Sequence, residues 1–211
     1  QATIAIEDTN FYQHSALDFK ALTRAMLSNI AVSLHLKSGV VQGGSTITQQ
    51  LAKKAFLSDE RTWTRKFKEA IIAYKLENTF TKDEILALYL NQIPYGANAY
   101  GIEAAAQTFF QKSITDVTLS QAALLVSLPQ APSYYSPYGS HVKELLARKN
   151  LVLKQMEAQG FISSGQRATA EQEQFTFSAL KNLRQAPHFA IEIRQYLEDA
   201  YGEDFVRRSG L

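Results

Sequence analysis

The chain has 211 residues, of which 45% are hydrophobic and 20% charged, and its formal net charge is +2. That length fits one large domain or a domain with an appendage, and the small net charge argues against nucleic acid as the main partner. The absence of cysteine excludes disulfides, thiol catalysis and cysteine metal sites, and the four scattered histidines form no HExxH zinc motif.

The hydrophobic pattern of the first half predicts helices. Residues 17–36 and 59–78 place apolar side chains at helical spacing. No stretch reaches the roughly 18 uninterrupted apolar residues that span a bilayer. In the segment 59–78 the apolar residues share one side of the predicted helix at about 100° per residue. They form a stripe of Trp63, Phe67, Ala70, Ile71 and Tyr74.

Capping signals predict the helices that follow. Thr81 with Glu84, and Thr118 with Gln121, have the spacing of capping boxes and precede the apolar runs ILALYL and AALLVSL. A long helix is predicted from about 142 to 159, where Gly160 ends it.

The remaining segments are less regular. Loops are predicted at 94–101 and at 129–132, and the one candidate strand is EQFTF at 173–177. After about residue 165 the composition turns polar, and a last helix is predicted at 188–202.

A glycine turn beside hydroxyl and amide side chains is the first candidate binding feature. In the stretch VVQGGSTITQQLAKKAF, either Ser45 or Thr46 can cap a helix, with the lysines facing solvent. The alternative is a groove for a ligand that is rich in hydroxyls and carries an anion. The stretch lacks the GxxxxGK[ST] pattern of a nucleotide phosphate loop.

The helix predicted at 59–78 has a basic side opposite its apolar stripe. Arg61, Arg65 and Lys68 lie there, with Glu69 at the edge. One interpretation is a solvated face with an Arg65–Glu69 pair worth about 0.3–0.5 kcal/mol. The other is a partly covered cation cluster for a phosphate or pyrophosphate, since Ile72 falls on this side too.

Two adjacent carboxylates near the start of the chain are the third candidate. Glu7 and Asp8 follow an apolar segment, and Phe11 and His14 come soon after. A carboxylate among apolar and aromatic neighbours suits general acid or base catalysis. The alternative is that both are acids at the start of a helix.

Five segments together resemble a known family. EDTNFYQH, QGGSTITQQLAK, RKFKE, KDEILALYLN and ARKNLVL occur in the order and spacing of the motifs of family 51 glycosyltransferases, the peptidoglycan polymerase domains of class A penicillin-binding proteins. The likeness covers about residues 1–160. The sequence departs from the family pattern at Ala16, where glycine is usual, and at Lys149, where a second arginine is usual.

The resemblance implies a mainly α, lysozyme-like fold with a large helical head and a smaller membrane-facing jaw. It implies a peptidoglycan glycosyltransferase domain over residues 1–165. Residues 166–211 would be a C-terminal helical segment leading toward an absent transpeptidase domain.

The implied reaction is the polymerisation of lipid II by inverting transfer, with release of undecaprenyl pyrophosphate. Glu7 would be the general base, and Glu69 would orient cations, bind a divalent ion such as Mg or Mn, or assist the donor sugar. No cofactor is otherwise required. The implied substrate-binding residues are Asp8, Phe11, His14, Ser45, Thr46, Gln49, Gln50, Lys53, Arg61, Arg65 and Lys66.

The implied partners are lipid II, the growing lipid-linked glycan, phosphoglycolipid inhibitors of the moenomycin type and the membrane surface. The location would be the outer face of the bacterial cytoplasmic membrane, with an N-terminal transmembrane anchor in the parent chain. We expect an exposed apolar patch for the membrane among residues 26–41, including Met26, Ile30, Leu34, Val40 and Val41.

Two other functions remain open from the residues alone. A lysozyme-like or lytic peptidoglycan-cleaving enzyme would also use Glu7, and two carboxylates can perform inverting hydrolysis. Such an enzyme has no need for four cations near its second carboxylate. A non-catalytic glycan-binding module is the other alternative, and the presence of both carboxylates argues against it.

Overall fold

A computed structural model describes residues 1–24, 44–57, 60, 62–178, 196–197 and 200–201. Arg61 and the apolar patch predicted at 26–41 lie outside these residues. The chain divides into two units, Gln1–Ser178 and Ala179–Leu211. In the second unit the described residues, 196–197 and 200–201, are helical.

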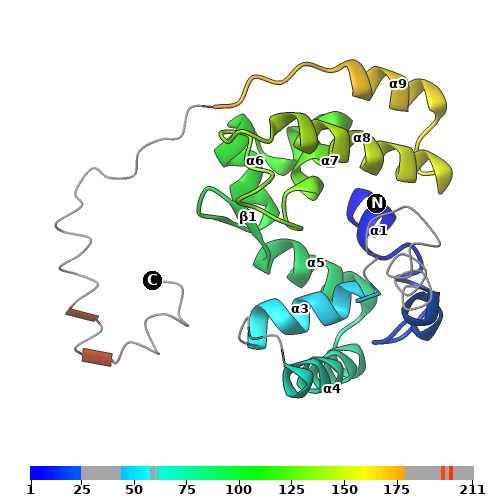
Figure 1. Cartoon of the computed structure of the whole chain (residues 1–211), viewed down its shortest axis with the longest axis vertical. Coiled ribbons are helices and arrows are strands. Elements are labelled where there is room, and N and C mark those ends of the chain that lie inside the picture. Colours follow the sequence, from blue (N-terminus) through cyan, green and yellow to red (C-terminus); the bar gives the residue numbers. More distant parts are fainter. Residues whose placement is uncertain (25–43, 58–59, 61, 179–195, 198–199, 202–211) are drawn as a thin grey trace, which may run out of the picture. The chain divides into compact units, whose positions relative to one another are not determined.

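The first unit is built mainly from helices (Figure 1). Residues 19–24 are also helical. The elements in chain order are α1 (Ala2–Glu7), α3 (Ile47–Phe56), α4 (Trp63–Thr79), α5 (Lys82–Gln92), β1 (Pro94–Gly96), β2 (Ala99–Tyr100), α6 (Ile102–Phe110), η1 (Ile114–Asp116), α7 (Leu119–Ser127), α8 (Val142–Ala158) and α9 (Ser164–Gln172).

The predicted capping boxes are confirmed. Thr81 and Glu84 open α5, and Thr118 and Gln121 open α7, each with both reciprocal hydrogen bonds. Of the two possible caps for α3, Thr46 is the one used. These side chains satisfy backbone N–H groups that have no partner within the helix, and so they fix where each helix begins.

The segment 94–101, predicted as a loop, contains a short antiparallel hairpin of β1 and β2. Its turn holds Gly96, Ala97 and Asn98 at positive φ. Strands this short contain too few residues to show an alternating pattern, so they carry no strand signal in the sequence. Glycine is needed at position 101, where φ is +82° and a Cβ would lie 2.8 Å from the Asn91 carbonyl oxygen.

The strand considered at 173–177 does not form. The segment runs without regular structure, and its rings pack on α6, with Phe175 and Phe177 each about 6.1 Å from Phe110 between ring centroids. At its end the Ser178 N–H donates to the Phe109 carbonyl at 3.0 Å. Its alternating aromatic residues therefore serve side-chain packing rather than pairing with another strand.

Two groups of buried side chains hold the first unit together. The larger includes Ile47 of α3, Tyr89 of α5 and Leu124 of α7. The smaller joins α1, α7, α8 and α9 through residues such as Ala5 and Val152. Because α1 is held in the smaller group, the carboxylates at its end have a fixed position.

Helix α4 is oriented differently from what its apolar stripe suggests. Trp63 is 91% exposed and Phe67 69% exposed, and Ile71 and Tyr74 are also exposed. The buried residues of α4 are Glu69, Ala73 and Leu76. Helix α4 lies beside α3 (Figure 1). Ala73 and Leu76 belong to the larger core group, so the side of α4 that carries the buried carboxylate faces inward.

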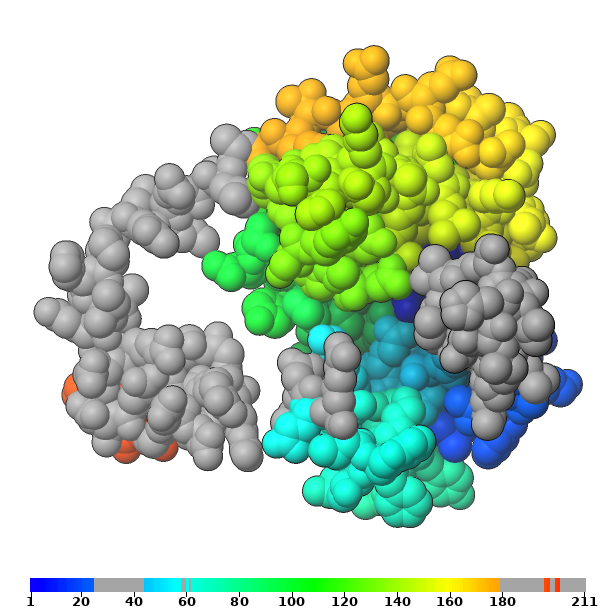
Figure 2. Space-filling view, viewed as in Figure 1, coloured from blue at the N-terminus to red at the C-terminus, as the bar shows by residue number. Residues whose placement is uncertain are grey.

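Helix α9 is part of the first unit. It packs on α8, and the two form one continuous surface in the space-filling view (Figure 2). The boundary expected at residue 165 therefore falls within this unit, near the start of α9. In the part of the chain that the structure describes, no helix combines the length and apolar character needed to cross a membrane.

Candidate active site

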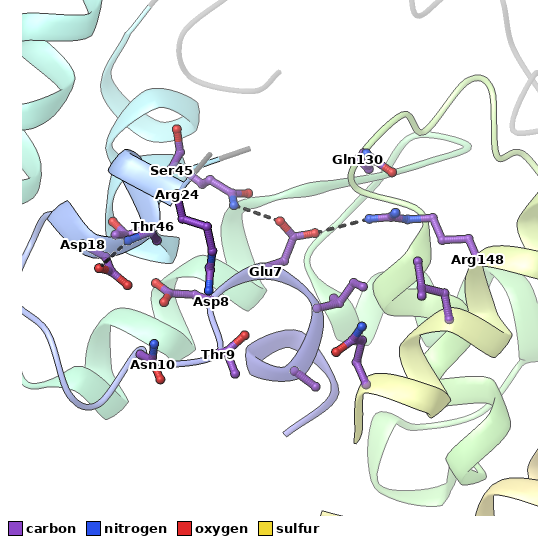
Figure 3. A pocket seen from close by; sticks show the side chains of 17 residues that line it. Glu7, Asp8, Thr9, Asn10, Asp18, Arg24, Ser45, Thr46, Gln130 and Arg148 are labelled. Atoms are coloured by element: carbon purple, nitrogen blue, oxygen red, sulfur yellow. Dashed lines mark hydrogen bonds and ion pairs between the residues drawn. The ribbon is translucent and has the colours of Figure 1, made fainter. Parts of the chain in front are cut away.

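A cleft of about 730 Å³ lies at the end of α1. Its walls come from residues 5–10, from Asp18 and the helix that follows it, from residues 44–50 at the start of α3, from Gln130 and from α8. Figure 3 shows Glu7 in this cleft, between Arg148 on one side and Ser45 and Arg24 on the other.

Glu7 is the last residue of α1, and Asp8 is its C-cap. The interpretation of these residues as helix-start acids is therefore wrong. A carboxylate at the C-terminal end of a helix faces the negative end of the helix dipole, so it needs stabilising contacts from elsewhere.

Other elements supply those contacts to Glu7. The Gln50 amide nitrogen of α3 donates to Glu7 Oε2 at 2.9 Å. On the other side, the Arg148 guanidinium of α8 lies 3.7 Å from Glu7 Oε1. The Glu7 side chain keeps 17% of its surface exposed, so its carboxylate is held in place and still reachable from the cleft.

Asp8 is committed to structural contacts. It accepts a hydrogen bond from the Ile47 N–H at 3.0 Å, at the start of α3, and lies 2.7 Å from His14 Nε2. Its position at the N-terminus of α3 is favourable for a carboxylate. Asp8 thus ties the start of α3 to the loop that carries His14, and this contact places the α3 side chains next to Glu7.

Several residues predicted to bind substrate have their side chains engaged within the protein. Phe11 is fully buried in the core. Thr46 and Gln49 form the capping box of α3, and the Thr46 hydroxyl also donates to the Ala16 carbonyl at 2.7 Å. Thr46 still lines the cleft, as do Asp8, Ser45 and Gln50.

The second predicted carboxylate lies in a cation cluster. Glu69 is 2% exposed, and it pairs with Arg65 at 2.8 Å and with Lys66 through its other oxygen. Lys66 also donates to the Ser45 hydroxyl at 2.9 Å. The sequence-predicted residues Ser45, Arg65, Lys66 and Glu69 are therefore brought together, and Ser45 connects this cluster to the cleft.

This geometry favours one of the roles considered for Glu69. Both of its oxygens contact cations, so a divalent ion there would have to compete with Arg65 and Lys66. In the described ranges, no group of three or more His, Cys, Asp or Glu residues is placed to hold a metal ion. The arrangement fits a carboxylate that orients two cations.

The cleft also contains residues to which the sequence interpretation gave no role. Arg148 is the most important, with its Nε donating to the Ser127 carbonyl at 3.2 Å and its guanidinium 5.6 Å from the centroid of the Tyr135 ring. Arg24 and Gln130 line the same cleft. Arg148 lies in the motif ARKNLVL, but nothing in a helical pattern tells which of two adjacent cations faces a site 141 positions earlier in the chain.

Comparison with known proteins agrees with this geometry. The family model described as transglycosylase matches residues 1–157, and the chain belongs to this family of glycosyltransferases. Penicillin-binding protein 1A of Aquifex aeolicus (strain VF5) is 44% identical over 202 residues, which are 96% of this chain and 27% of that protein. Penicillin-binding protein 1F of Bacillus subtilis (strain 168) is 44% identical over 171 residues, 81% of this chain and 23% of that protein.

A solved structure shows the same fold. The crystal structure of penicillin-binding protein 1A from Haemophilus influenzae has a TM-score of 0.50 and 33% identity, covering 76% of this chain and 20% of that one. The resemblance to family 51 glycosyltransferases and the mainly helical, lysozyme-like fold are thereby confirmed. The chain spans about a quarter of the length of the curated relatives it matches. The family to which the chain belongs is therefore neither one of glycan-cleaving enzymes nor one of non-catalytic binding modules.

Proposed function

We propose that the first unit polymerises lipid II into glycan strands by inverting transfer and releases undecaprenyl pyrophosphate. The observation that carries this proposal is the arrangement of the two carboxylates. Glu7 is held open to the cleft, whereas Glu69 is buried between Arg65 and Lys66. One is placed to accept a proton, and the other to hold cations for an anionic leaving group.

Glu7 is the general base in this proposal. It takes the proton from the 4-hydroxyl of the acceptor sugar while that oxygen attacks the anomeric carbon of the lipid-linked donor. The new carbon–oxygen bond forms as the bond to the pyrophosphate breaks, so a single displacement converts the α linkage to β. Correctly placed bases contribute about 10²–10⁴-fold to such reactions.

The cation cluster stabilises the leaving group. Charge grows on the pyrophosphate as its bond to the sugar breaks, and fixed cations in a covered site stabilise it more than water does. Lys66 and Arg65 are held by Glu69, and Ser45 connects them to the cleft. Lys53 of α3 is half-buried, and we assign it to the same anion site, with Arg61 from the sequence alone.

The exposed stripe of α4 supports a membrane surface as a partner. Trp63, Phe67 and Tyr74 are aromatic and exposed, and the exposed Lys68 and Lys75 lie along one edge of the stripe. Aromatic and aliphatic side chains bordered by lysines are typical of helices that lie in a lipid interface. A lipid-linked substrate would be delivered along such a surface.

The setting in the parent protein is also part of the proposal. The relatives are named for binding penicillin, and the chain spans about a quarter of their length. This supports a transpeptidase domain fused in the parent chain. An anchor that holds the unit at the outer face of the cytoplasmic membrane belongs to the same proposal, in keeping with the lipid surface proposed for α4.

The decisive experiment is Glu7→Gln, assayed for polymerisation of purified lipid II. The amide keeps the shape of the side chain but cannot accept the proton, so we expect turnover to fall below a few per cent of wild type. A moenomycin-type inhibitor should still bind, which shows that the cleft is intact. Turnover of the variant above that level would remove Glu7 from the base role. If the wild-type protein cleaved glycan without releasing pyrophosphate, its function would be lytic and not polymerisation.

A further inference from the structure

A chain of hydrogen bonds runs from the core to Glu7. Tyr89 of α5 is 1% exposed, and its hydroxyl donates to the Gln50 amide oxygen at 3.1 Å. The nitrogen of the same amide donates to Glu7 at 2.9 Å. Three helices, α5, α3 and α1, are thus connected by two side-chain bonds that end on the proposed base.

The Tyr89 hydroxyl supports the orientation of the Gln50 amide that the Glu7 carboxylate requires. The two ends of an amide have nearly the same shape but opposite hydrogen-bonding character. An ionised carboxylate only accepts hydrogen bonds, so a reversed amide would place its oxygen against the Glu7 oxygen. A donor on the far side of Gln50 holds the amide oxygen there and directs the NH₂ group at Glu7.

Tyr89 is suited to remain a donor. Burial raises the pKa of its phenol well above the ordinary value of 10.0, and the negative charge of Glu7 raises it further. The hydroxyl therefore keeps its proton across the working range of an enzyme. In the part of the chain that the structure describes, this buried, protonated hydroxyl donates to the Gln50 oxygen.

We infer that Tyr89 is a positioning residue for the Glu7 base, acting through the amide of Gln50. This inference rests on the proposed function. The amide fixes the direction of the Glu7 carboxylate, and a hydrogen bond donated to a carboxylate interacts with its negative charge. Tyr89 itself does not line the cleft, so it acts on the reaction only through Gln50.

Other charged groups around Glu7 do not depend on Tyr89. Arg148 approaches from α8 at 3.7 Å, and Asp8 is the next residue in the chain. Asp18 and Arg24 line the same cleft. All of these remain when the Tyr89 hydroxyl is removed, so a change in pH dependence would report the bond through Gln50.

The test compares two tyrosines with the same substitution. Tyr95 of β1 is also 1% exposed, and its buried hydroxyl has no hydrogen-bond partner among the described residues. Tyr89→Phe should lower kcat for lipid II polymerisation about five-fold, the size of one ordinary hydrogen bond. The acid limb of its pH–rate profile should move to higher pH, with KM little changed. Tyr95→Phe should leave all three at wild-type values.

A double mutant separates positioning from packing. In a Gln50→Leu background, which already lacks the amide, Tyr89→Phe should cause no further shift of the acid limb. Gln50→Leu alone should shift the acid limb in the same direction as Tyr89→Phe. This variant therefore tests the inference even if Tyr89→Phe folds poorly. Thermal unfolding of each variant shows which of them are folded.

The outcomes that overturn the inference are distinct from those that overturn the proposed function. If Tyr89→Phe and Tyr95→Phe behave alike, or if the Tyr89→Phe shift persists in the Gln50→Leu background, Tyr89 has no positioning role. If Glu7→Gln still polymerises lipid II, the base assignment fails first. If Glu7→Gln is inactive while the kinetics of Tyr89→Phe match wild type, only the positioning role of Tyr89 is refuted.

Discussion

Arg148 and Lys149 are adjacent in α8 and carry the same charge, but their surroundings differ completely. Arg148 reaches toward Glu7 in the cleft. Lys149 is 2% exposed and donates to the Ala170 and Glu171 carbonyls at 3.2 and 3.3 Å, near the end of α9. Desolvation lowers the pKa of Lys149, with Glu171 and Glu173 acting in the opposite direction. Two neighbouring cations on a helix point about 100° apart, so one serves the site and the other the packing.

The same argument applies to Lys53 and Lys54 of α3. Lys53 is half-buried and Lys54 is exposed. Lys53→Ala should lower polymerisation ten-fold or more, on the order of 1.4 kcal/mol, because a fixed cation near the leaving group is lost. It should also weaken the binding of ligands that carry pyrophosphate or phosphoglycerate.

Lys54→Ala is the matched control and should matter far less. The measurement is the rate of lipid II polymerisation of the two variants side by side. Equal losses would mean that the cations act through a general positive field, and the assignment of Lys53 to the anion site would then be wrong.

At the scale of elements, α4 shows how a helix can expose its apolar stripe. Its inward side carries Ala73 and Leu76, which pack in the core, together with the buried Glu69. Burying Glu69 is tolerable because Arg65 and Lys66 both pair with it. The larger apolar residues are left outside, where a lipid surface is the partner that we propose.

The double substitution Trp63→Ser with Phe67→Ser tests that surface. These side chains are 91% and 69% exposed, so the thermal stability of the isolated protein should be unchanged. Binding to vesicles that contain anionic lipid should weaken at least about ten-fold, since each large apolar side chain contributes about 1.5–3 kcal/mol when it leaves water. Co-sedimentation with the vesicles measures this.

The control for this experiment is Tyr100→Ser on β2, a residue that is 68% exposed and lies outside the stripe. Its vesicle binding should match wild type. Undiminished binding of the α4 variant would rule out the stripe as the lipid contact.

For the whole molecule, the extent of the folded unit depends on contacts that follow the last motif. The segment after α9 returns to α6 through Phe175, Phe177 and the Ser178 N–H. Thr118, the cap of α7, donates to Glu173 at 2.7 Å. These contacts join residues far apart in the sequence, and they place the end of the compact unit at Ser178.

Truncation distinguishes this boundary from the one expected at residue 165. A chain ending at Ser178 should unfold at the same temperature as the first unit of the longer chain. A chain ending at residue 165 loses α9, the acceptors of Lys149 and the aromatic contacts on α6. If that loss is about 3 kcal/mol, the midpoint should fall by at least about 6 °C. Calorimetry of the two chains would refute the Ser178 boundary if their midpoints coincide.

Much of the local structure could be predicted from the sequence. The Thr81–Glu84 and Thr118–Gln121 boxes located two helix starts correctly, and the long helix before Gly160 occurs as α8 at Val142–Ala158. These features are local, because a cap joins residues three positions apart and a helix end depends on its own backbone. The five motifs also indicated the family, which the transglycosylase model confirmed over residues 1–157.

The direction in which each side chain faces was decided by the tertiary structure. Periodicity indicated that α4 has an apolar and a basic side. It did not indicate that the smaller apolar residues and Glu69 would be the ones buried against the core. The sequence proposed Glu7 and Gln50 as site residues, yet only the packing of α1, α3 and α8 shows that Gln50 and Arg148 flank Glu7. Contacts between residues 43 or 141 positions apart depend on how helices pack, and the pattern within each helix carries no record of its neighbours.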